Sequence, residues 1–453
     1  MPHVAFSTTL IFSALLVAMI ACLALEEKLH AKKSVIVGLF ATLSLFLSAA
    51  FGLVRPETVE ILHHPVRLPV YIPGVDWEVI AIILGSSIFV DVTSKSGLFT
   101  WIAIKLTKTS RGDPLRLLVF YGVMTVVFSA VLNNVTAMII VGTLSAVSLG
   151  KLGRLDKLLG FLLIEGLLTN VGGLLTLISS VPNIIIGNAA GISFVTFFIK
   201  SSPYVVVATV LTLWLGAKLF RIPKLAGEAE RAEAARLVAG FDENDGIESK
   251  GFFWFGALMT ALFIAAMASA SVTPYIKDLG LGYVALAFAA IALTRYKATA
   301  DRFYQAIDWD LLAFFGCLFI VINMMEHALV LELIGKALAP IMALGDLAGP
   351  GTLLVAASVA SSVTDNIPLA AMLAKILGAM ELSGDSPLWW AVIFGANLGG
   401  NITPIGSAST LVAVTIIHKN KLPMSFASFV KLAIPFALAQ LALAVAYVLL
   451  VLS

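Results

Sequence analysis

The chain is a succession of long apolar runs separated by short polar segments. About 20 apolar residues cross the hydrocarbon core of a bilayer as a helix, and in lipid a helix satisfies its own backbone hydrogen bonds. Runs of that kind cover residues of about 4–25, 34–54, 77–106, 193–220, 251–272, 278–295, 309–332 and 425–452. The pattern predicts an all-α polytopic membrane protein. No basic region precedes the first run, so it is predicted to be a retained helix rather than a signal peptide.

Four further apolar segments are interrupted by Asn, Gly, Pro and Ser, and they lie at 113–150, 156–190, 350–380 and 387–417. An unpaired backbone amide or carbonyl is costly in hydrocarbon, so non-helical backbone survives there only when it is buried in protein or lines a cavity. The interruptions therefore mark places where the backbone meets a ligand, an ion or water.

The two halves of the chain resemble each other. VDWEVIAIILG at 75–85 matches IDWDLLAFFGC at 307–317, with an offset of 232 positions (76 to 308). SAVLNNVTAM at 129–138 matches SSVTDNIPLA at 361–370 with the same offset (133 to 365). NVGGLLTLISSVPN, which begins at 170, aligns with NLGGNITPIGSAST, which begins at 397, so the offset there is 227. Three blocks in one order indicate an internal duplication.

A charged segment at 221–250 divides the two copies. Its sequence, RIPKLAGEAERAEAARLVAGFDENDGIESK, holds five basic and seven acidic residues. We expect a solvated linker there, with a short surface helix at about 226–238. The predicted organisation is a first repeat half at 1–220, the linker, and a second half at 251–453.

The basic residues predict the topology. They cluster near 28–33, 105–116, 151–157, 218–224, 295–302 and 419–421. All of these loops lie inside, as the positive-inside rule prefers, only if 113–150 and 350–380 are re-entrant hairpins. Asp76 then lies outside and its repeat mate Asp308 inside, so the two repeats are inverted. We expect a multi-pass protein of the plasma membrane with a cytoplasmic linker.

Polar residues occupy matching places in the two copies. Asn133-Asn134 and Asp365-Asn366 fall at the predicted hairpin tips, whereas Asn170-Val171-Gly172-Gly173 and Asn397-Leu398-Gly399-Gly400 fall within the two broken helices. Glycine permits non-helical turns, and Asn supplies neutral donors and acceptors. Inverted repeats with broken helices are typical of secondary transporters, in which half-helix ends face the substrate and the coupling ion. The sequence thus predicts a binding site where these interruptions meet.

Two acids in apolar segments are candidates for ion coupling. Asp365 is predicted to bind a cation or to titrate, because an intramembrane acid is a functional-site hypothesis by default. It could instead cap the helix that follows it. Glu165 could serve in coupling or could be a structural residue paired with a lysine. The repeat mate of Asp365 is the neutral Asn133, so the two tips are not expected to be equivalent.

Composition narrows the class of protein. The chain has 453 residues, of which 60% are hydrophobic and 12% charged, and its formal net charge is +2. Soluble domains have roughly 25% charged residues. Nothing here indicates a nucleic-acid partner, and both cysteines lie in apolar segments, so no disulfide framework, metal site or cofactor is expected. No HExxH, nucleophile-elbow or phosphate-loop motif occurs, which disfavours an enzyme.

The sequence resembles the ion transporter superfamily, in the citrate-transporter-like branch that includes arsenite permeases, D-type sodium/proton antiporters and the P protein. The resemblance extends from about residue 30 to the end. The segments that carry it are DWE at 76–78, SGLFTWIAIKL at 96–106, LNNVTAMII at 132–140, IEGLLTNVGG at 164–173, SVPNIII at 180–186, TDNIP at 364–368 and GGNITPIGSASTLV at 399–412.

This resemblance implies an elevator mechanism, in which a transport domain of hairpins and broken helices moves against a scaffold that is usually dimeric. It implies that the site is lined by Asn134, Asn170, Thr176, Asn183, Asp365, Asn366, Asn397, Thr403 and Ser407. The chain departs from the family at Asn133, because Asp-Asn is frequent at the first hairpin tip.

Three transport functions remain open from the sequence. The first is secondary active transport of a small inorganic ion, of the arsenite or anion permease type, with Na⁺ or H⁺ as candidate coupling ion. The second is sodium/proton antiport, with Asp365 as the titrating group. The third is sodium-coupled symport of a di- or tricarboxylate, which is mildly disfavoured because no Arg falls in the predicted site.

Overall fold

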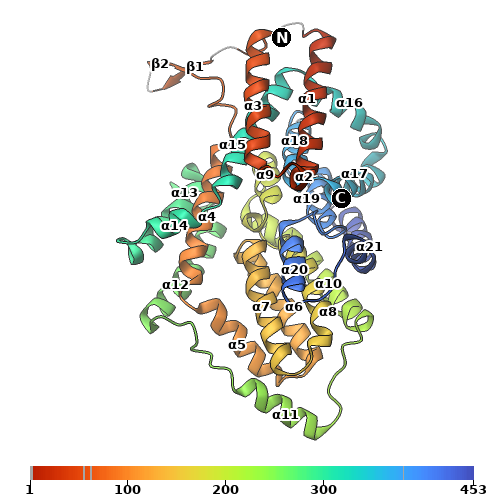
Figure 1. Ribbon diagram of the computed structural model, residues 1–453. Coiled ribbons are helices and arrows are strands. Elements are labelled where there is room, and N and C mark those ends of the chain that lie inside the picture. The colour runs from red at the N-terminus through yellow and green to blue at the C-terminus, as the bar shows by residue number, and fades with distance from the viewer. Residues whose placement is uncertain (1–3, 55–56, 62–63, 381, 453) are drawn as a thin grey trace.

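The computed structural model describes residues 4–54, 57–61, 64–380 and 382–452, and within them the chain is almost entirely helical (Figure 1). The first half contains α1 (Phe6–Ala24), α2 (Glu26–Leu29), α3 (Lys33–Ala50), β1 (Glu57–Ile61), β2 (His64–Leu68), α4 (Trp77–Ser94), α5 (Leu98–Ser110), α6 (Pro114–Val131), α7 (Asn134–Lys151), η1 (Leu155–Lys157), α8 (Leu158–Gly172), η2 (Leu177–Ser179), α9 (Val181–Ala190) and α10 (Phe194–Leu219).

The linker contains α11 (Glu228–Ala239), close to the predicted surface helix. The second half contains α12 (Lys250–Ser269), α13 (Ile276–Leu293), η3 (Thr294–Tyr296), α14 (Asp301–Ala306), α15 (Trp309–His327), α16 (Val330–Met342), α17 (Gly345–Val363), α18 (Asn366–Gly378), α19 (Pro387–Gly399), α20 (Ala408–Lys419) and α21 (Phe426–Val451). The series α4 to α10 and the series α15 to α21 share one order of elements, and each ends in a helix of 26 residues with an internal proline, Pro203 or Pro435.

The first matching block produces the same local structure twice. Asp76 caps α4 by accepting hydrogen bonds from the backbone N–H groups of Glu78 and Val79, and Asp308 caps α15 by accepting one from the N–H of Leu311, the position equivalent to Val79. The following tryptophan in each copy donates its indole N–H to a backbone carbonyl five residues earlier, at 3.1 Å in the first half and 2.8 Å in the second. A capping carboxylate before an apolar run fixes where each helix begins.

The two halves interlock rather than forming separate bodies. Helix α4 packs on α13, α15 packs on α3, α8 packs on α20, and α19 packs on α9. In Figure 1, α4 and α12 to α15 lie on one side, whereas α6 to α10 and α17 to α21 form the centre and the opposite side. We call the first set, together with α1 and α3, the outer group and the second set the inner group.

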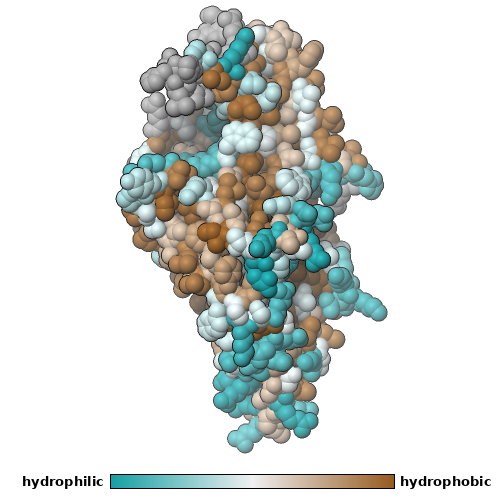
Figure 2. All heavy atoms as spheres, turned by 90° about the vertical axis from the view of Figure 1, so that its left-hand side faces the viewer, coloured by the Kyte–Doolittle hydropathy of each residue, from teal (hydrophilic) through white to brown (hydrophobic). Residues whose placement is uncertain are grey.

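Many of these helices are long enough to cross a membrane. Ten helices in the described part of the chain are long and apolar enough to span a bilayer. Figure 2 shows that hydrophobic residues dominate the middle and upper part of one face, whereas hydrophilic residues gather at the lower end, where Figure 1 places α11. The protein is therefore a multi-pass membrane protein, in agreement with the apolar pattern of the sequence.

Two long runs are divided in a way that the sequence did not predict. The run 77–106 was predicted as one span, but Gly97 at φ 81° separates α4 from α5. The run 309–332 was also predicted as one span, but Leu329 at φ 60° separates α15 from α16. The predictions were wrong because a single residue in the left-handed region ends a helix without changing the hydropathy of the run. The antiparallel hairpin of β1 and β2 was not predicted either.

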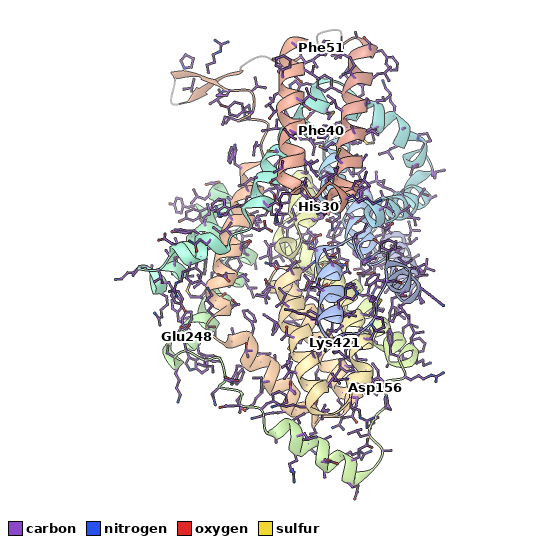
Figure 3. The ribbon with its side chains drawn as sticks, viewed as in Figure 1. His30, Phe40, Phe51, Asp156, Glu248 and Lys421 are labelled. Atoms are coloured by element: carbon purple, nitrogen blue, oxygen red, sulfur yellow. The ribbon has the colours of Figure 1, made fainter. Side chains whose placement is uncertain are left out.

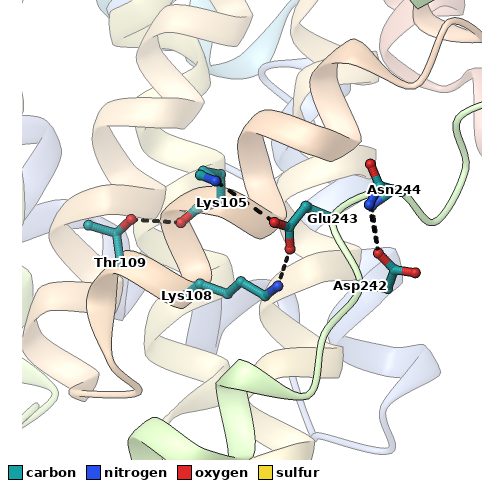
Figure 4. A network of polar contacts seen from close by, with 6 residues as sticks. All are labelled: Lys105, Lys108, Thr109, Asp242, Glu243 and Asn244. Atoms are coloured by element: carbon teal, nitrogen blue, oxygen red, sulfur yellow. Dashed lines mark hydrogen bonds and ion pairs between the residues drawn. The ribbon is translucent and has the colours of Figure 1, made fainter. Parts of the chain in front are cut away.

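The charged linker docks on the end of α5. Figure 4 shows Glu243 accepting a hydrogen bond from Lys108, with the Lys105 ammonium 3.8 Å from its carboxylate. The hydrogen bond from Lys108 lowers the pKa of Glu243 below its ordinary value. A second ion pair joins Arg154 to Glu230 of α11. The linker is thus held along the lower end of the molecule by ion pairs with Lys105 and Lys108 of α5 and with Arg154.

One basic corner lies apart from the others. The positive-inside pattern grouped residues 28–33 with the loops near 151–157 and 419–421. Figure 3 shows His30 at mid-height, with Asp156 and Lys421 well below it. The structure therefore places the corner between α1 and α3 near the middle of the molecule, at a different level from the loops that hold Asp156 and Lys421.

Candidate functional site

The predicted helix breaks are present, and the structure brings them together. Helix α8 ends at Gly172 and α9 begins at Val181, with only the short η2 turn between them. Helix α19 ends at Gly399 and α20 begins at Ala408. Each break therefore leaves about two turns of the chain outside regular α-helix, within the interior of the inner group.

The two breaks are joined by a reciprocal pair of hydrogen bonds. Ser407 donates its hydroxyl to Asn170 Oδ1 at 2.9 Å, and Ser180 donates its hydroxyl to Asn397 Oδ1 at 2.7 Å. Ser180 and Ser407 are repeat mates in the alignment, as are Asn170 and Asn397. Each half thus supplies the serine that holds the asparagine of the other half.

We call the turn between α6 and α7 the first corner and the turn between α17 and α18 the second corner. Each corner is held against the neighbouring break by the same two hydrogen bonds. Ser129 at the end of α6 donates to the Thr169 carbonyl at 2.7 Å, and its mate Ser361 donates to the Ala396 carbonyl at 2.6 Å. Thr176 in the first break donates to the Ala130 carbonyl at 2.7 Å. Its mate Thr403 donates to the Ser362 carbonyl at 2.6 Å. Both halves build this joint from side-chain hydroxyls and backbone carbonyls.

Glycine allows these segments to approach so closely. A Cβ built on Gly172 would lie 2.7 Å from the Cα of Val126, and a Cβ built on Gly399 would lie 2.3 Å from the Ser358 carbonyl oxygen. These glycines are therefore close-packing positions between helices, and the packed partner is the corner helix that precedes each tip.

An amide network fills the centre between the breaks. Asn397 donates to Asn183 Oδ1 at 2.8 Å, and Asn170 donates to Asn401 Oδ1 at 2.8 Å. Asn401 donates in turn to Gln440 of α21 at 2.7 Å. The four asparagines are at most 2% exposed. These hydrogen bonds join side-chain amides to one another and involve no charged side chain. The centre between the breaks therefore offers only neutral donors and acceptors.

The first corner carries two of the predicted asparagines. Asn133 is exposed and caps α7 by accepting a hydrogen bond from the Thr136 N–H at 2.7 Å. Asn134 is half-buried and accepts a hydrogen bond from Ser129 at 2.5 Å, which ties it to the first break. At the second corner Asn366 is half-buried. Within the described structure, neither Asn133 nor Asn366 has a side-chain hydrogen bond to the buried network, whereas Asn134 is linked to it through Ser129.

Asp365 has two partners. Its Oδ1 accepts the Ile367 N–H at 3.0 Å and so caps α18, and its Oδ2 accepts a hydrogen bond from Lys33 of α3 at 2.6 Å. The capping role is therefore real, and it uses only one of the two carboxylate oxygens. Asp365 is not bonded to the amide network, so the acid and the asparagines form neighbouring parts of the inner group rather than one cluster.

Glu165 is fully buried in α8. One of its oxygens accepts a hydrogen bond from Ser145 of α7 at 2.5 Å, and within the described residues its other oxygen has no hydrogen-bond partner. The predicted lysine partner does not occur among the described residues. Thr169 lies one turn further along α8 and donates to Ser409 at 2.7 Å, next to Asn170. Glu165 therefore lies one helical turn from the amide network.

Two cavities lie where the outer and inner groups meet. A cavity of about 470 Å³ is lined by Asp76, Asn188, Glu326 and Lys375, between α15 and the segment before α4 on one side and α9 and α18 on the other. A second of about 290 Å³ is lined by Glu78, Asn188 and Lys277. The four asparagines of the amide network line neither cavity and are at most 2% exposed, so they are enclosed by protein in this conformation.

The sequence reasoning missed several polar residues of the site. Ser180 could have been found, because the repeat alignment pairs it with Ser407. Asn401 could have been noticed as an amide in an apolar run, although its repeat mate is Leu174. Lys33 and Gln440 carried no signal, because only the packing of distant helices brings them to Asp365 and Asn401.

Comparison with solved structures shows the fold. The YdaH transporter of Alcanivorax borkumensis matches with a TM-score of 0.56 and 13% identity, covering 92% of this chain and 98% of that one. MtrF of Neisseria gonorrhoeae, described as an antimetabolite efflux pump, matches with a TM-score of 0.57 and 13% identity, covering 93% and 95%. At this identity the likeness concerns the arrangement of helices.

Comparison with known sequences gives closer matches. The uncharacterized transporter Rv2684 of Mycobacterium tuberculosis is 29% identical over 384 residues, which is 83% of this chain and 86% of that protein. The human P protein is 27% identical over 453 aligned positions, covering 83% of this chain and 53% of the P protein. The citrate transporter (CitMHS) family model matches residues 8–395. The chain therefore belongs to the citrate transporter family of the ion transporter superfamily, and it is a membrane transporter.

Proposed function

We propose that the protein is a secondary active transporter that moves a small inorganic ion, of the arsenite or anion permease type, by an elevator motion coupled to H⁺ or Na⁺. The observation that carries this proposal is the reciprocal pair of bonds from Ser407 to Asn170 and from Ser180 to Asn397. Two broken helices that hold each other through matched polar residues enclose a pseudo-symmetric site, the arrangement found at the repeat interface of secondary transporters.

The chemistry of the site supports a small solute with few charges. The network offers amide and hydroxyl groups, which bind hydroxide-like or monoanionic species by hydrogen bonding. Within the described residues, no Arg side chain contacts Asn170 or Asn397, and a tricarboxylate would be bound more strongly by guanidinium groups. A neutral arsenite hydroxide or a small oxyanion fits this donor set.

The second candidate is a sodium-coupled di- or tricarboxylate symporter. The description of the matching family, citrate transporter, favours it. The cavity beside Asn188 and Lys375, with a volume of about 470 Å³, is large enough for a small organic acid. Sodium/proton antiport remains a third candidate, with Asp365 as the titrating group.

The arrangement of the helices supports an elevator motion. The inner group carries both corners and both breaks, and its joints with the outer group contain the two cavities. Helices α5 and α16 occupy equivalent places in the two halves and connect the outer to the inner group. In this proposal the corners α6–α7 and α17–α18 are re-entrant hairpins of inverted repeats, the outer group is the scaffold of a homodimer in the plasma membrane, and the linker is cytoplasmic.

Coupling is assigned to the two acids. Asp365 lies at a corner with one oxygen free of capping, and Glu165 is a buried carboxyl with one oxygen unpartnered in the described structure. A proton or Na⁺ reaching either group removes a charge that is costly in a protein interior. The transported solute and the coupling ion then occupy adjacent places in one moving body.

Uptake into proteoliposomes tests the proposal. Arsenite, citrate, succinate and Na⁺ with an internal pH dye form the panel, and Asn170→Ala and Asn397→Ala are compared with the wild type. We expect one solute of the panel to accumulate against its gradient and both variants to lose that accumulation. Arsenite accumulation supports the first candidate, and citrate or succinate accumulation replaces it with the second. Flux of wild-type size in both asparagine variants would contradict the assignment of the site.

A further inference from the structure

Lys33 joins the outer group to the second corner of the inner group. Its Nζ lies 2.6 Å from Asp365 Oδ2, and the two side chains are 36% and 15% exposed. Lys33 is the first residue of α3, whereas Asp365 is the cap of α18. The contact therefore links a helix of the outer group directly to the corner that carries a coupling candidate.

Lys33 is surrounded by more negative than positive charge. Glu26 lies 3.8 Å from its Nζ, and Asp310 of α15 accepts hydrogen bonds from the hydroxyl and the backbone N–H of Ser34, at 2.5 and 3.3 Å. Two carboxylates thus lie within 4 Å of one ammonium group, and the third, Asp310, interacts with it electrostatically at longer range. A second cation can enter this cluster without leaving an excess of positive charge.

The internal duplication shows that the pair is confined to one half. Asp310 bonds Ser34 N at the start of α3, and its repeat mate Glu78 bonds Leu281 N at 3.0 Å after the kink in α13. Ser34 therefore corresponds to Leu281, and Lys33 corresponds to Gly280. The mate of Asp365 is Asn133. Both partners of the ion pair are replaced together by neutral residues in the other half.

Because both charges of the ion pair are missing in the first half, we infer that the pair acts in only one of the two end states of the proposed motion. We propose that Lys33 is a tethered counter-cation that holds the second corner against α3, and that the coupling cation must displace it from Asp365. This inference rests on the proposed ion-coupled function and adds Lys33 to it. Because Asp365 Oδ1 is occupied by the Ile367 N–H, a cation that binds Asp365 competes with Lys33 for Oδ2.

Displacement breaks a contact between the two groups of helices. A bound proton or Na⁺ neutralises Asp365, so the ammonium of Lys33 loses its partner and the second corner is released from α3. At the equivalent place of the other half, Gly280 and Asn133 offer no ion pair to be broken. Binding of the cation therefore changes the relative stability of the two end states of the proposed motion.

The experiment compares Lys33→Gln with Lys32→Gln as a matched control, because Lys32 is the neighbouring lysine and is exposed. The purified full-length protein is titrated with NaCl against choline chloride at constant ionic strength, and separately with acid, and the thermal unfolding midpoint is recorded. We expect the half-maximal NaCl concentration, or the proton concentration, to fall roughly fivefold in Lys33→Gln, the size expected for a partly exposed ion pair. Lys32→Gln should match the wild type.

Asp365→Asn provides the second variant, and it places at the second corner the residue that the first corner already has. We expect it to abolish both cation responses. An unchanged titration in Lys33→Gln overturns the proposal, and so does a wild type that responds to neither cation. If Asp365→Asn fails to fold, the comparison of the two lysine variants still tests whether Lys33 competes with the cation for Asp365. The readout needs no transported solute, so failure of the uptake panel and failure of this inference are distinguishable.

Discussion

Gly399 lies where α19 approaches the corner helix α17 so closely that a methyl group does not fit. A Cβ at this position would lie 2.3 Å from the Ser358 carbonyl oxygen and 2.7 Å from Ser361 Cβ. The nearest atom belongs to the backbone, so no side-chain rotation removes the clash and the two helices must separate. Separation also weakens the bond from Ser361 to the Ala396 carbonyl, which is 2.6 Å long.

We therefore expect Gly399→Ala to lower the free energy of unfolding by about 2–4 kcal/mol. Overpacking costs about 1–3 kcal/mol, and a lost buried hydrogen bond adds about 1 kcal/mol. Gly172→Ala should behave similarly, because its Cβ would lie 2.7 Å from the Val126 backbone. Proposed transport should fall in both variants, because the same joint positions Asn397 or Asn170.

Gly316→Ala is the matched control. Gly316 lies within α15, and a Cβ there meets nothing within 4 Å. Replacement of glycine by alanine in a helix interior stabilises by about 1 kcal/mol, so the control should move in the opposite direction. Thermal unfolding of the purified variants, monitored in one detergent, gives the comparison. A Gly399→Ala protein as stable as Gly316→Ala would refute the close approach of α19 to α17.

Three further predictions concern the charged residues. Asp365→Asn should abolish ion-coupled flux in proteoliposomes while the protein stays monodisperse on size exclusion. Flux of wild-type size in this variant would contradict the coupling role of Asp365. Asn133→Asp should alter the dependence of flux on the coupling ion. Glu165→Gln should keep the fold, since the amide can still accept from its serine partner, but should remove the proton dependence of uptake; an unchanged pH profile would exclude Glu165 from coupling. The contact of Glu243 with Lys108 should hold the linker at neutral pH, because the pKa of Glu243 is lowered in the folded state, and its contribution should disappear as pH falls through that lowered pKa. Limited proteolysis of 221–250 by an acid-active protease should then accelerate, and Glu243→Gln should show the fast rate already at higher pH.

The joint between corner and break shows how far the sequence could predict this site. The repeat alignment, with its offsets of 232 and 227, already paired Ser129, Thr176 and Asn170 with their mates. The residue types of each joint could therefore be predicted from the sequence. Their hydrogen bonds were not, because Ser129 meets the Thr169 carbonyl only when α6 and α8 pack together. The same holds for Gly172, whose close-packing role depends on which helix comes near it.

Asp365 illustrates the other limit. Its position before a helix start allowed both a cap and an ion site, and the structure shows the cap on one oxygen and Lys33 on the other. Lys33 is 332 residues away in the chain, and its partner is chosen by the packing of α3 on α15. No local pattern of hydrophobic and polar residues carries that information.

The sequence by itself determined the membrane-spanning character of the chain, its duplication and the two matched breaks, between α8 and α9 and between α19 and α20. These properties follow from hydropathy and from the backbone preferences of glycine, asparagine and proline, which act over a few residues. The tertiary structure alone decided which polar groups meet: Ser407 with Asn170, Ser180 with Asn397, and Lys33 with Asp365. The reason is physical, because a buried polar side chain must find a hydrogen-bond partner, and in an interlocked bundle the nearest partner belongs to a distant helix.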